Sequence, residues 1–346
     1  MRKSVSKYIK ELSKLLDDSS NIVLICHINP DGDAIGSMLG MYHYLRGKSR
    51  KVSMVSPNQL PKFLKWMPGA GDIGTFDNNP GNAVKQIKEA DLVILLDFNE
   101  SSRIERLWPL IEDSGKKIIL IDHHPSPTIK CDLLVSEPGM SSTAELVYEL
   151  VNQIERDFHN NMDFIESVYV GMMTDTGNFN FGTFDGDTLR NVARMLDSGL
   201  RKDYITNSIY SNFSSSRMRL MGFALSERMV VLPQYHTAYI YLSKADLDRY
   251  NHITGDTEGF VNMPLTIEGI IFSVLFIERS DHIKLSLRSK GVFDVNRFAS
   301  EHSIGGGHRN ASGGKSPLDL EDCLGWFESL LPGSAAELNE SYSKGL

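Results

Sequence analysis

The sequence contains little cysteine and no long uninterrupted apolar run. Its 346 residues include three cysteines, Cys26, Cys131 and Cys323, and no C-x-x-C pair. An odd number at these spacings argues against a disulfide framework and a zinc–thiolate site, and fits a reducing compartment. The longest apolar stretch, residues 267–277, contains polar residues and is too short to cross a bilayer. Residues 1–18 lack the apolar core of a signal peptide, so we expect a soluble, cytoplasmic protein.

An excess of positive charge is also missing. The chain has 36 lysines and arginines against 44 acidic residues, a formal net charge of -8. Proteins that grip long duplex DNA or RNA normally carry a basic face that displaces counterions. The charge balance therefore favours small phosphorylated ligands over long duplex nucleic acid. The proportions of hydrophobic (41%) and charged (23%) residues are ordinary for a globular enzyme.

The first half of the chain alternates short apolar runs with helical patterns. Four of these runs, at residues 21–26, 51–55, 91–96 and 117–121, are rich in β-branched residues. Helical patterns lie between or after them, as in residues 34–45 and 141–154, and residues 164–174 fit a helix or a buried strand. Runs that are apolar on both faces and separated by helices indicate a parallel sheet covered on both sides. We therefore expect a doubly wound parallel-sheet α/β domain over residues 1–185.

The second half of the chain has a different pattern. Residues 186–216 are polar and helical and end in a serine-rich segment, which predicts a linker or hinge. Strand-like runs follow at residues 230–232, 238–242, 270–277 and 282–287, and an amphipathic helix is expected over residues 320–331. These patterns predict a smaller C-terminal α/β domain with a mixed sheet over residues 217–335. A flexible tail is expected over residues 336–346, and the active site in the cleft between the domains.

Acidic residues and histidines follow the apolar runs of the first half. In chain order they are His27, Asp31 and Asp33 after the first run, Asp97 after the third, Asp122, His123 and His124 after the fourth, and Asp175 after a later apolar segment. In an open parallel sheet, ligands bind beyond the carboxyl ends of the strands. We therefore expect these side chains to converge at one edge of the sheet.

The residue types at this edge favour a metal site. Imidazole and carboxylate ligands without thiolate suit Mn²⁺ or a similar cation. The four carboxylates of Asp31, Asp33, Asp97 and Asp175 would repel one another if they were partly buried together. Two divalent cations would balance their charge, so the count predicts a two-metal site, in which the ions typically lie ~3.5–4 Å apart.

Each residue also has a simpler interpretation. His27 could be a hydrogen-bonded structural histidine, and Asp31 and Asp33 could form a turn and a helix N-cap. Asp97 could cap the following helix, and the triplet at residues 122–124 could be a solvated turn. These interpretations leave the crowding of negative charge unexplained, so the combination favours the metal site.

Taken together, the motifs resemble those of the DHH phosphoesterase superfamily. HINPDGDAIGS at residues 27–37, Asp97, the Asp-His-His triplet and Asp175 within GMMTDTG occur in the order of that family. In the second half, GGGHRNASG at residues 305–313 resembles the glycine-rich loop of the DHH-associated domain. The two-domain layout and the helix start at residues 141–145 are similar to the nanoRNase/pAp-phosphatase (NrnA-like) group.

The resemblance implies roles for the residues of the first half. The implied ligands are His27, Asp31 and Asp97 for one metal and Asp33, Asp97, His123 and Asp175 for the other, so that Asp97 bridges. His124 would face the scissile phosphate. Asp122 would not bind metal itself but would orient the residues that do. The implied cofactor is a pair of Mn²⁺ ions, with Mg²⁺ or Co²⁺ as substitutes.

A second candidate site lies in the C-terminal half. The run Gly305, Gly306 and Gly307 precedes His308 and Arg309, and Arg288 lies on the strand-like run KLSLRS. Backbone N–H groups of a glycine run and arginine side chains both bind phosphate. A flexible loop with solvated surface cations is the alternative. The resemblance favours substrate binding.

The sequence therefore predicts a two-metal phosphoesterase. Its predicted substrates are short oligoribonucleotides and linear dinucleotides, hydrolysed to mononucleotides, and 3′-phosphoadenosine 5′-phosphate (pAp), hydrolysed to AMP. Three alternatives stay open: a pyrophosphatase or exopolyphosphatase, a RecJ-like single-strand exonuclease, and a nucleotide-binding module without catalysis. No membrane or long duplex partner is expected, and the sequence leaves both a monomer and a homodimer open.

Overall fold

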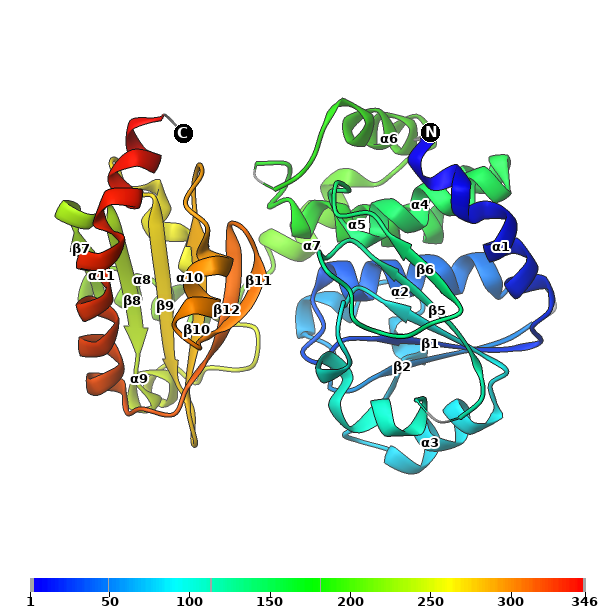
Figure 1. The fold of residues 1–346 in the computed structure, drawn as a ribbon, viewed down its shortest axis with the longest axis horizontal. Helices are drawn as coiled ribbons and strands as arrows, with labels where there is room; N and C mark the ends of the chain where they lie inside the picture. The colour runs from blue at the N-terminus through cyan, green and yellow to red at the C-terminus, as the bar shows by residue number, and fades with distance from the viewer. Residues whose placement is uncertain (1–2, 49, 113, 181, 345–346) are drawn as a thin grey trace. The chain divides into compact units, whose positions relative to one another are not determined.

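The computed structural model describes residues 3–48, 50–112, 114–180 and 182–344 (Figure 1). The chain divides into two compact units between Asn212 and Phe213. Each unit contains one six-stranded sheet. Within the described residues, no helix combines the length and the apolar character that crossing a membrane requires.

The first unit is built on a parallel sheet with the strand order β3-β2-β1-β4-β5-β6. The strands are β1 (Asn21–Cys26), β2 (Lys51–Ser56), β3 (Gly74–Thr75), β4 (Leu92–Leu96), β5 (Lys117–Asp122) and β6 (Leu133–Ser136). All five pairings are parallel, and β1, β4 and β5 are direct neighbours. The predicted doubly wound α/β architecture is confirmed.

Helices cover both faces of this sheet. One face packs against α1 (Ser6–Asp17), α2 (Gly32–Leu45), α4 (Thr143–Ile154) and α5 (Met162–Asp175), and the other against α3 (Pro80–Glu89) and the 3₁₀ segment η4 (Ser101–Leu110). Successive side chains of a strand point to opposite faces. In β1, Leu24 accordingly belongs to the first core and Val23 to the second. Because both faces are buried, the strands are apolar runs without alternation.

Glycines allow α2 and α5 to approach closely. A Cβ added to Gly36 of α2 would lie 2.6 Å from the carbonyl oxygen of Ser167 and 2.8 Å from the nitrogen of Gly171, both in α5. A Cβ added to Gly171 would lie 2.4 Å from the Cβ of Ala144 in α4 and 2.8 Å from Oδ1 of Asp33. The absence of side chains at these positions brings three helices together beside Asp33.

Two further helices complete the first unit. They are α6 (Gly186–Asp197) and α7 (Lys202–Tyr210), and the short 3₁₀ segments of this unit are η1 (Lys3–Val5), η2 (Lys62–Leu64), η3 (Ala70–Asp72) and η5 (Arg156–Asn160). Met195 of α6 and Ile205 of α7 are buried in the same core as α2 and α5. Residues 186–212 therefore fold as part of this unit, and the hinge expected over residues 186–216 stays a prediction.

The second unit has a mixed sheet with the order β11-β12-β10-β9-β8-β7. Its strands are β7 (Met229–Leu232), β8 (Thr237–Leu242), β9 (Phe272–Glu278), β10 (Ile283–Ser289), β11 (Gly305–His308) and β12 (Ala311–Ser316). Its helices are α8 (Ser215–Glu227), α9 (Lys244–Arg249), α10 (Val295–Glu301) and α11 (Leu320–Ser343). The 3₁₀ segments of this unit are η6 (Pro233–Tyr235) and η7 (Phe260–Thr266). β8 and β9 are parallel, and the other pairings are antiparallel. The predicted mixed sheet is confirmed.

The last helix is longer than the sequence predicts. We expected it to end at Leu331, with a flexible tail over residues 336–346, but α11 continues through Pro332 to Ser343. Leu338 is completely buried, and the hydroxyl of Ser341 accepts hydrogen bonds from the N–H groups of Val292 and Phe293, at 3.2 Å each. This packing outweighs the helix hydrogen bond that a proline removes.

Candidate metal centre

Three neighbouring strands deliver polar side chains to one edge of the first sheet. His27 directly follows β1, Asp97 directly follows β4, and Asp122 is the last residue of β5. The strands are parallel, so their carboxyl ends lie at the same edge, where α/β proteins bind ligands. All three residues are buried: His27 is 3% exposed, Asp97 2% and Asp122 0%. The sheet therefore places titratable groups in a buried environment, close to one another.

The first group of candidate ligands contains His27, Asp31 and Asp97. Nε2 of His27 lies 3.8 Å from Oδ1 of Asp31 and 3.5 Å from Oδ2 of Asp97. Nδ1 of His27 lies 2.8 Å from the carbonyl oxygen of Ile28, and this oxygen can only accept. Nδ1 therefore carries a proton, and Nε2 is the nitrogen that faces the two carboxylates and is placed to bind a metal.

The second group contains Asp33, His123 and Asp175. Nε2 of His123 lies 3.7 Å from Oδ2 of Asp33 and 3.5 Å from Oδ2 of Asp175. Asp33 lies in the first turn of α2 and Asp175 ends α5, so this group depends on the close contact between those helices. In each of the two groups, one ligand atom from every residue lies within 4.8 Å of the others.

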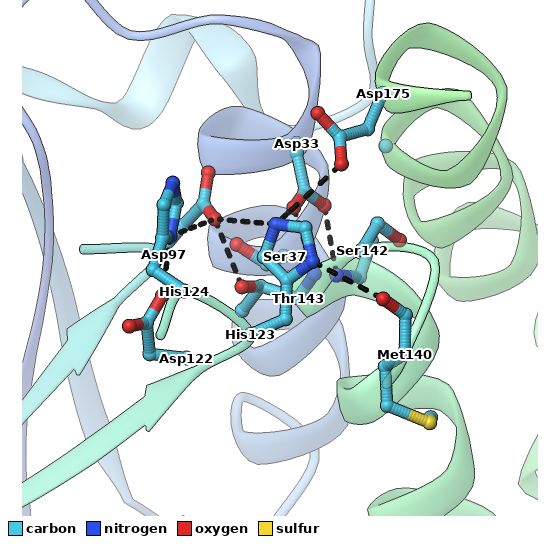
Figure 2. A network of polar contacts seen from close by, with 12 residues as sticks. Asp33, Ser37, Asp97, Asp122, His123, His124, Met140, Ser142, Thr143 and Asp175 are labelled. Atoms are coloured by element: carbon cyan, nitrogen blue, oxygen red, sulfur yellow. Dashed lines mark hydrogen bonds and ion pairs between the residues drawn. The ribbon is translucent and has the colours of Figure 1, made fainter. Parts of the chain in front are cut away.

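Asp97 connects the two groups, and Figure 2 shows it beside His123 and His124. Its Oδ2 faces His27, whereas its Oδ1 lies 3.8 Å from Nε2 of His123 and 3.8 Å from Nδ1 of His124. Burial alone would raise the pKa of this carboxyl. The hydrogen bond with His27 and the charges of His124 and His123 reverse the effect and hold the pKa of Asp97 far below its usual range. Asp97 is therefore ionised, with one oxygen directed to each group.

His124 is oriented by Asp122. Nδ1 of His124 donates to Oδ1 of Asp122 at 2.7 Å, and Oδ2 of Asp122 has no hydrogen-bond partner among the described residues. Burial lowers the pKa of His124. The hydrogen bond with Asp122 and the charge of Asp97 have a larger, opposite effect, so the pKa of His124 lies above its usual value. Asp122 thus fixes the Nδ1–H tautomer and favours the imidazolium form.

Asp33 is held by the first turn of α4. Its Oδ2 accepts the N–H of Thr143 at 2.7 Å, and its Oδ1 accepts the N–H of Ala144 at 2.8 Å. Burial, together with the charges of Asp97, Asp175 and other nearby carboxylates, raises the pKa of Asp33 well above its usual range. The site therefore carries a charge imbalance that protons or cations can relieve.

The donor set fits divalent cations. Among the described side chains, no lysine or arginine forms an ion pair with Asp31, Asp33 or Asp97, whose ion-pair partners are histidines. Asp31 is exposed, whereas Asp33 and Asp97 are buried, and buried carboxylates without cationic side chains beside them are typical of metal ligands. Imidazole nitrogens beside them suit a borderline metal. Each predicted metal ligand lies in one of the two groups or, for Asp97, connects them.

Thr143 also belongs to the site, although no motif in the sequence predicts a role for it. The threonine hydroxyl donates to Oδ1 of Asp97 at 2.9 Å, and the backbone N–H of Thr143 donates to Asp33, so Thr143 contacts both of the buried candidate ligands that are carboxylates. In the sequence, residues 141–145 are distinguished only by their resemblance to a family helix start. A threonine one residue after a serine N-cap gives no sign in the sequence of which carboxylates lie opposite it.

The glycine cluster of the second unit forms a strand, and the expected loop is absent there. β11 pairs antiparallel with β12, and Gly305 lies opposite Gly314. A Cβ on Gly305 would lie 2.2 Å from the carbonyl oxygen of Gly313, and one on Gly314 would lie 1.8 Å from that of Ile304. These glycines are needed for close strand contact, a role that the glycine run in the sequence does not predict.

The other residues predicted to bind substrate lie near this hairpin. Arg288 is on β10, opposite Ala311 of β12, and its Nη1 donates to the carbonyl of Leu287 at 2.9 Å. Arg309 donates from Nη2 to the carbonyl of Val292, also at 2.9 Å. The side chain of His308 lies outside the described part of the structure.

The backbone N–H of Gly307 already has a partner, because it donates to Oδ1 of Asn296 at 2.8 Å. Of the three glycine N–H groups expected to bind phosphate, this one is engaged within the protein. The role of Gly305, Gly306 and Gly307 in substrate binding stays a prediction.

Two domain families match the chain. The model of the DHH family, N-terminal domain, matches residues 21–173, and that of the DHHA1 domain matches residues 234–330. The first match contains His27, Asp33, Asp97 and His123 and ends just before Asp175. The second contains β8 to β12, including the glycine hairpin.

Several relatives match both units. The "Bifunctional oligoribonuclease and PAP phosphatase NrnA" of Thermus thermophilus is 28% identical over 92% of this chain and 91% of its own length. The protein of the same name from Bacillus subtilis is 28% identical over 88% and 91%. A crystal structure of an exopolyphosphatase-related protein from Bacteroides fragilis is 39% identical and has a TM-score of 0.92, covering 98% of this chain and 100% of that one. The chain belongs to the DHH family of metal-dependent phosphoesterases, with a DHHA1 domain after the DHH domain.

Proposed function

We propose that the protein hydrolyses short oligoribonucleotides and linear dinucleotides to mononucleotides, and pAp to AMP. The observation that carries the proposal is the pair of ligand groups connected by Asp97, beside His124. Two such groups suit the in-line displacement of a phosphate ester. The relatives named oligoribonuclease and PAP phosphatase align over more than 85% of this chain, which supports this substrate class.

The proposed ligands form two sets. His27, Asp31 and Asp97 would hold one cation, and Asp33, Asp97, His123 and Asp175 the other. Two bound cations would activate water and offset charge on the phosphoryl oxygens. We propose Mn²⁺ as the metal, with Mg²⁺ or Co²⁺ as substitutes, because the donors are carboxylate oxygens and imidazole nitrogens.

His124 is the proposed proton donor. Its Nδ1–H is bound to Asp122, so its Nε2 is the atom through which it would transfer a proton to the leaving oxygen. The upward shift in the pKa of His124 keeps the ring protonated at higher pH than usual. Asp122 acts through His124 and is a positioning residue.

The second unit is the proposed substrate-binding unit. Arg288 and Arg309 are the candidate phosphate-binding side chains, with His308 and the glycine hairpin beside them. Arg288→Ala should raise KM for a diribonucleotide more than it lowers kcat, because a phosphate contact remote from the reaction contributes mainly to ground-state binding. Phosphate contacts of this kind favour a substrate with more than one phosphate or nucleotide.

A second candidate function is hydrolysis of phosphoanhydrides. The observation that favours it is the name of the 39% identical relative from Bacteroides fragilis, an exopolyphosphatase-related protein. Pyrophosphate and polyphosphate would use the same two-metal chemistry. They differ from nucleotides in having no base or ribose to recognise.

One substrate panel separates the two functions. Protein stripped with EDTA and reloaded with Mn²⁺ would be incubated with diribonucleotides, pAp, a cyclic dinucleotide, pyrophosphate and tripolyphosphate. Products would be resolved by anion-exchange chromatography, with His123→Ala as the inactive control. We expect diribonucleotides and pAp to be hydrolysed fastest. Turnover of pyrophosphate or tripolyphosphate alone would overturn the proposal and establish the second candidate.

A further inference from the structure

The first turn of α4 contacts Asp33 and Asp97, the two buried carboxylates among the candidate ligands. Thr143 donates from its hydroxyl to Oδ1 of Asp97 at 2.9 Å and from its backbone N–H to Oδ2 of Asp33 at 2.7 Å (Figure 2). Thr143 itself is completely buried. We propose that Thr143 is a positioning residue, which fixes the orientation in which Asp97 serves both ligand groups. This inference rests on the proposed function, because it assumes that the groups bind metal.

The orientation of Asp97 decides whether it can be shared. The oxygen that accepts from Thr143 is the one 3.8 Å from Nε2 of His123, whereas the other oxygen lies 3.5 Å from Nε2 of His27. Rotation of the Asp97 carboxylate about its Cβ–Cγ bond would turn at least one of its oxygens away from the ligand group that this oxygen faces. The χ2 angle of aspartate is a broad torsion, so a hydrogen bond is needed to define it. The Thr143 hydroxyl supplies such a bond at one oxygen.

The same turn also stabilises the charge of Asp33. The first N–H groups of a helix have no partner within the helix, and they carry the positive end of its dipole. Here the N–H groups of Thr143 and Ala144 each bind one oxygen of Asp33. A carboxylate oxygen has two lone pairs, so each oxygen can accept an N–H and still face a metal. The turn therefore fixes Asp33 without using up its capacity as a ligand.

The turn is itself held in place by Glu145. This buried carboxylate accepts from the N–H and the hydroxyl of Ser141, at 3.1 and 2.7 Å, and from the hydroxyl of Thr188 at 3.0 Å. Its other oxygen accepts from Nδ2 of Asn191 at 3.2 Å. Thr188 and Asn191 belong to α6, so the start of α4 is tied to a second helix. Thr143 consequently contacts Asp97 from a fixed position.

Threonine can be replaced by residues that separate shape from hydrogen bonding. Thr143→Val keeps the branched shape but places a methyl group against a buried carboxylate. Thr143→Ser keeps the hydroxyl, and Thr143→Ala removes it without adding a methyl group. Thr237→Val is the matched control, because Thr237 is also completely buried and donates its hydroxyl to the carbonyl of Tyr235, in the second unit.

The test is calorimetric titration of Mn²⁺ into metal-free full-length protein, which needs no substrate. We expect Thr143→Val and Thr143→Ala to lower Mn²⁺ affinity about 10–100-fold, the range typical for partners of metal ligands. Thr143→Ser should restore affinity to within about 3-fold of wild type, since it keeps the hydrogen bond. Thr237→Val should bind Mn²⁺ like wild type. At saturating Mn²⁺, the variants should regain part of their diribonuclease activity.

Two failures can be distinguished. If wild-type protein binds Mn²⁺ and both Thr143→Ala and Thr143→Val bind it equally well, Thr143 has no positioning role and the proposed function stands. If wild-type protein binds no divalent cation, both proposals are overturned. Circular dichroism identifies a variant that does not fold. Should Thr143→Val fail to fold, the comparison of Thr143→Ala with Thr143→Ser decides the question.

Discussion

Asp97 has a left-handed backbone conformation, with φ at 68°. Outside glycine this conformation is uncommon, although aspartate adopts it more readily than most residues. It occurs directly after β4, where the chain leaves the sheet and the carboxylate meets ligands from β1 and β5. Strained positions cluster at functional sites, because the surrounding structure must hold them in place. Here the hydrogen bond from Thr143 is one of the contacts that does so.

Replacing Asp122 with asparagine tests the role of His124. We expect kcat for a diribonucleotide to fall about 10–100-fold, since a partner that orients a catalytic group is lost. The charge of Asp122 helps to raise the pKa of His124. A protonated His124 is needed for proton donation, so the alkaline limb of the pH–kcat profile should move to lower pH in Asp122→Asn. Unchanged kcat and an unmoved limb would contradict the role. Mn²⁺ affinity, measured in parallel, shows whether the metal centre is intact.

The candidate metal ligands could be predicted from the sequence because they depend on local order. Each follows an apolar run, and the ends of parallel strands meet at one edge whatever the details of packing. Thr143 could not be predicted in the same way. Its contact with Asp97 depends on how α4 lies against the end of β4, and the local sequence does not encode that distance.

At the scale of the elements, the metal centre depends on the close contact of α2, α4 and α5. Gly36 and Gly171 lie where these helices meet, and any side chain there would overlap a neighbouring backbone or the Asp33 carboxylate. Asp33 and Asp175 are at the ends of α2 and α5, so their separation is set by this packing. Stability and ligand geometry are therefore coupled through the two glycines.

Gly36→Ala should destabilise the first unit. The added methyl group would lie 2.6 Å from a backbone oxygen, and overpacking of this kind costs about 1–3 kcal/mol. Gly81→Ala in α3 is the matched control, because its Cβ would meet no atom closer than 3.9 Å. We expect the control to be neutral or up to about 1 kcal/mol stabilising. Urea denaturation of both variants measures the difference, and equal stability would contradict the packing described here.

His43 should make the first unit less stable at acidic pH. It is buried in α2, and its ring donates from Nε2 to the carbonyl of Pro68 at 2.9 Å. Burial lowers its pKa below 6.5, so unfolding takes up a proton. The stabilising contribution is present above pH 6.5 and is lost as the pH falls through the lowered pKa.

The change His43→Gln removes this titration and retains a donor for Pro68. As the pH falls below 6.5, the free energy of unfolding should decrease less steeply in the variant than in wild type. The largest slope that one such group can contribute is about 1.4 kcal/mol per pH unit. Urea denaturation in EDTA measures both slopes without interference from bound metal. Identical slopes would mean that His43 does not titrate as described.

The boundaries of the elements were less predictable than their order. The runs that became β1, β4 and β5 were found because buried parallel strands are apolar throughout. The glycine run of β11 has no such pattern, and glycine is rare in strands, so its sequence favoured a loop. Proline at position 332 likewise predicted a helix end, whereas the contacts of Leu338 and Ser341 are long-range and extend α11.

At the scale of the whole molecule, the chain consists of two units, each with its own sheet and core. Aromatic side chains such as Phe272, Phe298 and Phe327 pack together in the core of the second unit. The end of α11 belongs to the same unit, where Tyr342 stacks on His236 with a centroid distance of 4.2 Å. The second unit thus depends on residues near the end of the chain.

Deleting residues 332–346 should destabilise the second unit. The deletion removes the buried side chain of Leu338 and the partner of two backbone N–H groups, a loss of about 3 kcal/mol or more. Differential scanning calorimetry should show a transition at lower temperature than in wild type. Deletion of residues 344–346 alone is the control, since it leaves Leu338 and Ser341 in place. A transition unchanged in the longer deletion would favour the flexible tail that the sequence predicts.

The most direct test of the account is the number of divalent cations that the protein binds. Equilibrium dialysis of metal-free protein against Mn²⁺, followed by elemental analysis, should give two ions per chain for wild type. Asp97→Asn should weaken both, because Asp97 faces both ligand groups, and Asp281→Asn, at an exposed carboxylate of the second unit, should weaken neither. One ion per chain, or two ions that Asp97→Asn leaves in place, would contradict a centre connected by Asp97.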